Sequence, residues 1–127
     1  PEDLQQRGLE MGRFAVTQRF QGGIPQWTCQ SGGIAELYAG DPESAVELLT
    51  EAEKASDTEL RGAAMVYRAM ALKQLGRDAD AATLLQQAET LLAEPLRTRA
   101  GGTWWDLELC QIALEKARQM IQLPAKP

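Results

Sequence analysis

The side chains that most often carry enzyme chemistry are sparse in this sequence of 127 residues. It contains no histidine, which removes Ser-His and Cys-His nucleophile pairs and most zinc-binding patterns. Its two cysteines, Cys29 and Cys110, lie far apart and show no CxxC spacing. We expect both to be small buried apolar residues, with a disulfide between them as the alternative.

Carboxylates are plentiful, and pairs such as Glu47 and Glu51 have the spacing of a solvated helix face. Asp78 resembles part of a metal-binding loop, but no series of ligands follows it, and a helix cap explains its position. The pairs Gly32-Gly33 and Gly101-Gly102 are not followed by Lys-Ser or Lys-Thr and do not follow a strand, so they are not phosphate loops. We therefore predict no enzyme activity, no metal and no cofactor.

The charge of the chain narrows the classes of partner. A net charge of -5 and a pI of about 4.8 leave no basic surface for nucleic acid. No apolar run approaches the roughly 20 residues that a membrane span needs. Carboxylates crowd the run from Asp41 to Glu59, which we interpret as a solvated surface, with a basic partner as the alternative.

Apolar residues at helical spacing predict an all-α domain that occupies residues 1–127. The second helix is the least regular, because Ser31, Gly32 and Gly33 lie in its middle, and a kink near Gly32 is the alternative. Six helices are expected. The first three span residues 3–20, 26–39 and 42 to about 55. The fourth starts at the capping segment 56–59 and ends at residue 75, and the last two span residues 78 to 92 or 93 and 103–121.

An internal repeat relates two parts of the chain. The pattern G-x4-A-x6-A starts at Gly40 and again at Gly76, 36 residues later, and a capping aspartate follows each glycine, Asp41 and Asp78. Small side chains at a helix crossing let two backbones approach closely, and a larger side chain would push the helices apart. The alanines at these crossings are Ala45, Ala52, Ala81 and Ala88.

This pattern resembles the tetratricopeptide repeat, a helix-turn-helix unit of about 34 residues. With Gly62 as place one, Ala69 falls at place 8, Gly76 at place 15 and Pro95 at the end. Arg68 and Glu36 depart from the family's pattern, which prefers Leu and an aromatic residue there. The resemblance implies an α-solenoid composed of a half repeat (3–20), two repeats (26–59 and 62–95) and a C-terminal capping helix (103–121).

The sequence of residues 67–89 is also similar to repeats in large bacterial regulatory proteins of the planctomycete type. The chain starts at Pro1, and its first helix matches only the second half of a repeat. We therefore expect a piece of a longer, cytoplasmic protein. The family's variety that captures acidic C-terminal tails uses Lys and Asn at places five and nine, which these units lack, so we expect no such capture.

The resemblance further implies that the first helix of each pair lines a concave groove for a partner peptide or helix. An equally weighted alternative is that the terminal helix, with Trp104 in its apolar stripe, folds back into this groove. The groove residues expected from the family's pattern are Trp27, Gln30, Ile34, Leu37 and Tyr38 in one unit and Ala63, Val66, Met70, Lys73 and Gln74 in the next.

The sequence thus predicts a non-catalytic module that binds a protein or peptide partner, with no nucleic acid and no membrane involved. The alternative function is a structural scaffold, in which the exposed Trp and the groove residues meet a second copy to form a homodimer. The oligomeric state in solution distinguishes the partner-binding module from the homodimeric scaffold.

Overall fold

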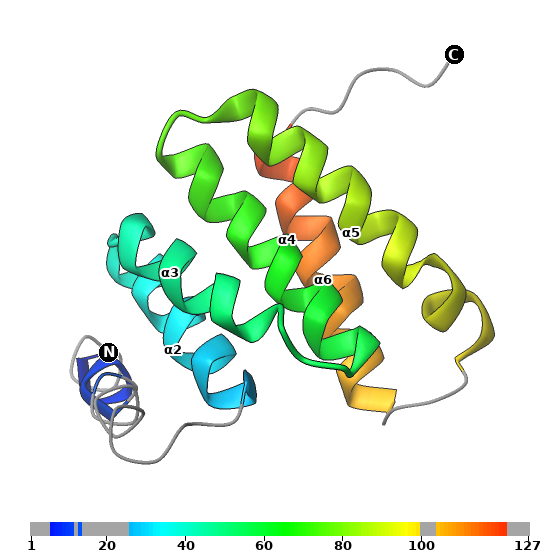
Figure 1. The fold of residues 1–127 in the computed structure, drawn as a ribbon, viewed down its shortest axis with the longest axis horizontal. Coiled ribbons are helices and arrows are strands. Elements are labelled where there is room, and N and C mark those ends of the chain that lie inside the picture. Colours follow the sequence, from blue (N-terminus) through cyan, green and yellow to red (C-terminus); the bar gives the residue numbers. More distant parts are fainter. Residues whose placement is uncertain (1–5, 12, 14–25, 100–103, 122–127) are drawn as a thin grey trace.

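The computed structural model of this protein describes residues 6–11, 13, 26–99 and 104–121, and the side chains of 104–106 are outside that description. The described chain is all-α, with six helices and antiparallel packing between consecutive helices. After an N-terminal helix, seen at residues 6–11 and 13, come α2 (Gln26–Ala39), α3 (Pro42–Ala52), α4 (Thr58–Gln74), α5 (Asp78–Thr98) and α6 (Trp104–Met120) (Figure 1).

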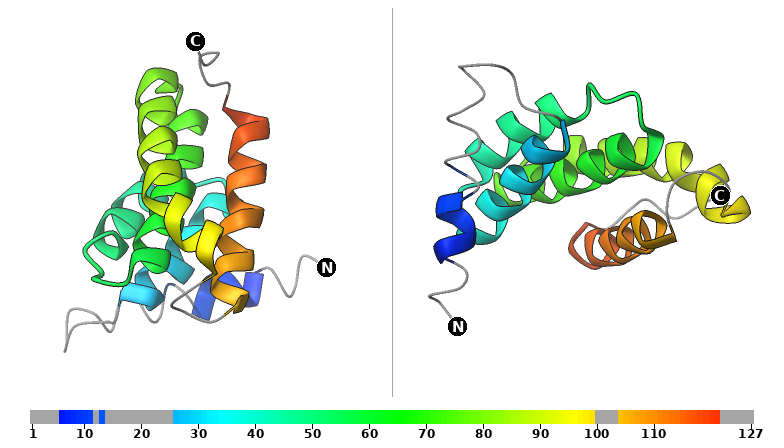
Figure 2. Two further views of the ribbon diagram at one scale, coloured as in Figure 1. Left: turned by 90° about the vertical axis from the view of Figure 1, so that its right-hand side faces the viewer. Right: turned by 90° about the horizontal axis from the view of Figure 1, so that it is seen from below.

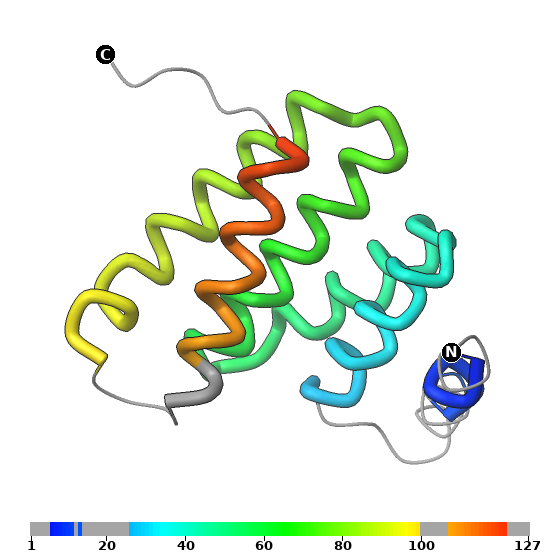
Figure 3. The backbone as a smooth tube through the Cα atoms, turned by 180° about the vertical axis from the view of Figure 1, so that it is seen from behind, coloured from blue at the N-terminus to red at the C-terminus, as the bar shows by residue number. Residues whose placement is uncertain are grey.

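Two helix pairs and one covering helix make up the packing. Helix α2 packs against α3, α4 packs against α5, and α3 joins the pairs through its contact with α4. Helix α6 lies on one side of the layer that α2–α5 form, against α4 and to a lesser extent α5 (Figure 2). It runs in the same general direction as α2, with α4 between them (Figure 3).

The same turn closes the first helix of both pairs. Gly40 and Gly76 adopt φ of 87° and 79°, a left-handed conformation that glycine reaches without a Cβ clash. The following N–H then donates back to a carbonyl in the last turn of the helix: Asp41 to Glu36, and Arg77 to Leu72, each at 2.9 Å. These turns repeat with the 36-residue offset of the sequence pattern, which confirms both glycines as helix ends.

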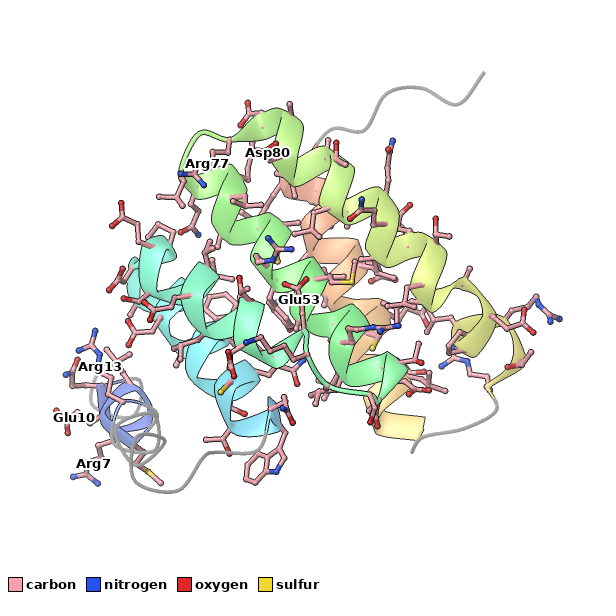
Figure 4. The ribbon with its side chains drawn as sticks, in the orientation of Figure 1. Arg7, Glu10, Arg13, Glu53, Arg77 and Asp80 are labelled. Carbon is pink, nitrogen blue, oxygen red and sulfur yellow. The ribbon has the colours of Figure 1, made fainter. Side chains whose placement is uncertain are left out.

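Only one of the two predicted aspartate caps is found after these turns. Asp41 caps α3 by accepting a hydrogen bond from the Ser44 N–H at 3.2 Å and another from the Ser44 hydroxyl at 2.8 Å. The prediction for Asp78 is wrong: the cap of α5 is Arg77, whose side chain makes no capping bond (Figure 4). Asp78 is two residues after Gly76, whereas Asp41 directly follows Gly40, so Asp78 becomes the first residue of α5 instead of its cap. Its carboxylate pairs with Lys73 at 3.1 Å.

The core contains the small residues that the repeat pattern singled out. The side chains of all four alanines at the crossings, Ala45, Ala52, Ala81 and Ala88, are fully buried. Helix α2 is continuous through Gly32, as expected from the sequence. A Cβ at Gly33 would lie 2.6 Å from Leu49 Cγ, which shows that close packing on α3 overrides the low helix propensity of this glycine.

Two helix ends differ from the sequence-based expectation. Helix α3 ends at Ala52 rather than near Ala55. Helix α5 continues through Pro95 to Thr98, and Arg99 then adopts a left-handed φ of 55°. Proline removes one hydrogen bond, but the helix resumes, since the Arg99 N–H donates to the Pro95 carbonyl at 2.9 Å. The rest of the predicted first helix, residues 3–5, 12 and 14–20, lies outside the described residues.

Candidate functional site

The exposed side of α2 carries two large aromatic residues. The side chains of Trp27 and Tyr38 are 61% and 60% exposed, while Gln30 and Ile34 between them are half-buried. Their spacings of three, four and four residues place all of them on one stripe of the helix. We call these four residues the α2 face.

The side of α2 that packs on α3 explains why this face points outward. Cys29, Gly33 and Leu37 are buried there, and Gly33 lies directly against Leu49 of α3. Since α3 covers that side, the stripe that starts at Trp27 remains uncovered by α3. Leu37 was expected in the groove, and this expectation is wrong because its side chain is only 2% exposed and belongs to the core.

The α4 half of the expected groove is filled. Val66 and Met70 are 0% and 3% exposed, and they share one core cluster with Cys110 and Leu114 of α6. Ala63, also expected in the groove, is buried in the same cluster. On α4 the alternative therefore holds, in which the terminal helix folds back onto the first helix of the second pair.

The last two expected groove residues lie at the C-terminal end of α4. Lys73 is half-buried and pairs with Asp78, whereas the side chain of Gln74 is exposed. Neither belongs to the α2 face. The structure thus divides the expected groove residues into the α2 face, a covered set on α4 and a pair at the α4–α5 turn, with Leu37 in the core.

Helix α6 adds apolar surface that the sequence analysis did not place in the site. Leu109 and Ile112 are 56% and 46% exposed, although both sit on a helix whose other side is buried. Lys116 is on the same stripe, one turn after Ile112, and its ammonium nitrogen lies 5.6 Å from the centre of the Tyr38 ring. This contact connects the surface of α6 with the α2 face.

Tyr67 of α4 has Tyr38 of α2 and Cys110 of α6 as electrostatic neighbours. Its side chain is half-buried. Burial raises the pKa of the Tyr67 phenol above its ordinary value, and the neighbouring Tyr38 and Cys110 raise it further. The phenol is therefore neutral and keeps its O–H donor throughout the physiological pH range.

The two departures from the family's pattern both form ion pairs. Glu36, almost fully buried, accepts two hydrogen bonds from Arg13 of the N-terminal helix, at 2.7 and 3.1 Å. Arg68 binds Glu53 at the end of α3, with an Nη2–Oε1 distance of 2.9 Å, and Glu53 lies over α4 in Figure 4. Charged residues at these two positions thus connect neighbouring helices.

The chemistry-bearing groups of the described chain are dispersed. Cys29 and Cys110 are both buried and are not joined in a disulfide, as the sequence predicted, and the Cys110 thiol donates to the Glu59 carbonyl at 3.5 Å. Within the described ranges, no three His, Cys, Asp or Glu side chains are grouped so that they could hold a metal ion. None of the helices in those ranges combines the length and apolar character needed to cross a bilayer.

Comparisons with models of known protein families, with characterised proteins and with solved structures each find no match. The resemblance to the tetratricopeptide repeat therefore depends on the residues and turns of this chain alone.

Proposed function

We propose that this chain is a non-catalytic protein–protein interaction module of the tetratricopeptide type, and that it works as a part of a larger cytoplasmic bacterial protein. Its binding surface is the α2 face together with the exposed residues Leu109 and Ile112 of α6. The partner is a peptide or helix of another protein. Neither nucleic acid nor a membrane is a partner, in keeping with the net charge of -5.

The exposed aromatic pair on α2 is the observation that carries this proposal. Trp and Tyr supply large contact areas at low cost in side-chain entropy, and both are enriched where proteins bind one another. Trp27 and Tyr38 are more than half exposed, and the Tyr38 ring lies 5.6 Å from the ammonium nitrogen of Lys116, which follows the exposed Leu109 and Ile112 on one stripe of α6. The repeated turns at Gly40 and Gly76 and the buried alanines support the repeat type.

The experiment compares capture of proteins from the source cells by the wild-type chain and by a Trp27→Ser/Tyr38→Ser variant. Both side chains are exposed, so the variant is expected to keep its far-ultraviolet circular dichroism. Met11→Ser serves as the matched control, because it also removes an exposed apolar side chain, 73% exposed, but from the N-terminal helix. A protein that the wild type and the control retain and the double variant loses is the expected result.

Equal capture by all three chains would contradict the α2 face as the binding surface. Variants of Val66 or Met70 are unsuitable for this test, because both side chains are in the core and a polar replacement would destabilise the fold.

A homodimer is the second candidate function, and the same exposed surface supports it. Light scattering on the purified chain separates the two proposals. A particle of twice the chain mass of 13.9 kDa, converted to monomer by Trp27→Ser/Tyr38→Ser, would favour the scaffold. A monomer for both chains would contradict it.

A further inference from the structure

Lys116 differs from most other cations of the described chain. Arg13, Lys73 and Arg118, for example, each bind a carboxylate of a neighbouring element. Lys116 forms no ion pair with the carboxylates of the described residues, and its ammonium group lies over the Tyr38 ring instead. A cation over an aromatic ring keeps most of its capacity to donate hydrogen bonds to an anion.

Helix α2, which lies across from Lys116, offers it no carboxylate as a counter-charge. The only carboxylate of α2 is Glu36, which is on the buried side of the helix and is held by Arg13. Leu109 and Ile112 precede Lys116 on its own helix stripe, and the α2 face lies across from it. The surface thus combines apolar side chains with a single positive charge.

This combination restricts what can cover the surface. A partner that buries the apolar side chains also takes Lys116 out of water, and a desolvated ammonium without a counter-charge costs several kcal/mol, on the order of the penalty for any buried ion. A carboxylate from the partner offsets that penalty.

The arrangement of the helices also indicates the form of the partner segment. Helices α2 and α6 run in the same general direction on either side of α4 (Figure 3). Residues of the two surfaces recur at about one-turn intervals: Ile34 lies one turn before Tyr38, and Ile112 one turn before Lys116. An amphipathic helix laid along them presents its own side chains at the same interval.

We propose that the partner segment is an amphipathic helix with a single Asp or Glu within its apolar stripe, and that this carboxylate binds the Lys116 ammonium while the stripe covers Trp27 and Ile112. This inference rests on the proposed function and adds the chemistry of the partner. The two repeat units lack the Lys and Asn with which the family's tail-capturing variety binds carboxylates. Lys116 belongs to α6, outside these units, so their absence does not exclude a carboxylate at Lys116.

The test is a selection from helical peptides displayed on phage, with the wild-type chain as bait. Peptides that also bind the Trp27→Ser/Tyr38→Ser variant are discarded, because they bind elsewhere. The retained peptides are expected to share an apolar stripe with Asp or Glu at one fixed position. Their affinity should fall about tenfold on Lys116→Met, the loss expected for one charge-assisted hydrogen bond.

Arg118→Met is the matched control, since Arg118 is another exposed cation on α6 but pairs with Glu89 and lies off this stripe. It should leave the affinity unchanged. Lys116→Glu should shift the preference at the fixed position from Asp or Glu to Lys or Arg.

Four results would overturn the inference. Retained peptides without an acidic position, or with equal affinity for the Lys116→Met and Arg118→Met chains, would refute the carboxylate and leave the proposed function standing. No peptide that depends on Trp27 and Tyr38 would refute both. A dimer in light scattering that Trp27→Ser/Tyr38→Ser dissociates would place a second copy of this chain on the surface instead of a partner helix.

Discussion

The replacement of Gly62 by alanine tests the packing of α4 on α5. A Cβ at this position would lie 2.5 Å from Leu92 Cδ2, 2.6 Å from Leu92 Cγ and 3.0 Å from Leu92 Cδ1. Leu92 is fully buried, and all three of these contacts involve the branched end of its side chain. A rotamer change therefore cannot clear the Cβ without a new clash in the core, and we expect α4 and α5 to move apart.

Two effects of opposite sign set the magnitude. Alanine is favoured over glycine in a helix interior by about 1 kcal/mol. Overpacking a core costs about 1–3 kcal/mol, and a contact this short belongs to the upper part of that range. The net expectation is a loss of about 1–2 kcal/mol in the free energy of unfolding. For a domain of this size, such a loss lowers Tm by about 3–8 °C.

Urea unfolding followed by far-ultraviolet circular dichroism measures the change, with Gly8→Ala as the matched control. No atom lies within 4 Å of a Cβ at Gly8, so that variant should show the helix gain without the clash. In a Leu92→Ala background the clash is absent, and Gly62→Ala should then stabilise the chain by about 1 kcal/mol. Equal effects of Gly62→Ala in both backgrounds, or stabilisation of the wild type, would refute the reasoning.

Three further predictions concern caps and pH. Asp41→Ala should lower the free energy of unfolding by about 1 kcal/mol in urea titrations; because hydrogen bonds from Ser44 lower the pKa of Asp41 from 3.8, this difference should persist above that pH and fade as the carboxylate protonates below it. Arg77→Asp should increase the free energy of unfolding by about 0.5 kcal/mol and so raise Tm, since α5 has no side-chain cap. An unchanged Tm would contradict the equivalence of the turns at Gly40 and Gly76. Because the native state holds the Tyr67 proton more tightly than the unfolded chain does, stability should fall as the pH rises above the ordinary value of 10.0, and Tyr67→Phe should reduce that alkaline loss in thermal scans.

The proposed binding surface shows which features the sequence could predict and which it could not. The stripe of Trp27, Gln30, Ile34 and Tyr38 follows from helical spacing, and the structure places its two aromatic ends in solvent. The same spacing gave no means to tell Val66 and Met70 from open groove residues, because a buried and an exposed apolar stripe look alike in sequence. The contact of Lys116 with Tyr38 was not predicted, because the two residues lie 78 positions apart in the chain.

The errors at helix ends have a related cause. Asp78 has the residue type of a cap, yet the glycine turn places Arg77 at the capping position and makes Asp78 the first residue of the helix. Pro95 carries a strong local signal to end a helix, but α5 continues for three residues beyond it. In both cases the general preference of the residue type, aspartate for a cap and proline for a helix end, was overridden by the surrounding turn or helix.

What the sequence by itself determined is local. The all-α class, the left-handed turns at Gly40 and Gly76, the cap at Asp41 and the burial of the repeated alanines follow from hydrogen bonds and periodicities that span a few residues. Only the tertiary structure decided which apolar stripes remain open. That outcome depends on α6, which covers Val66 and Met70 of α4 but packs its backbone against no part of α2, and local periodicity holds no information about where a distant helix will dock.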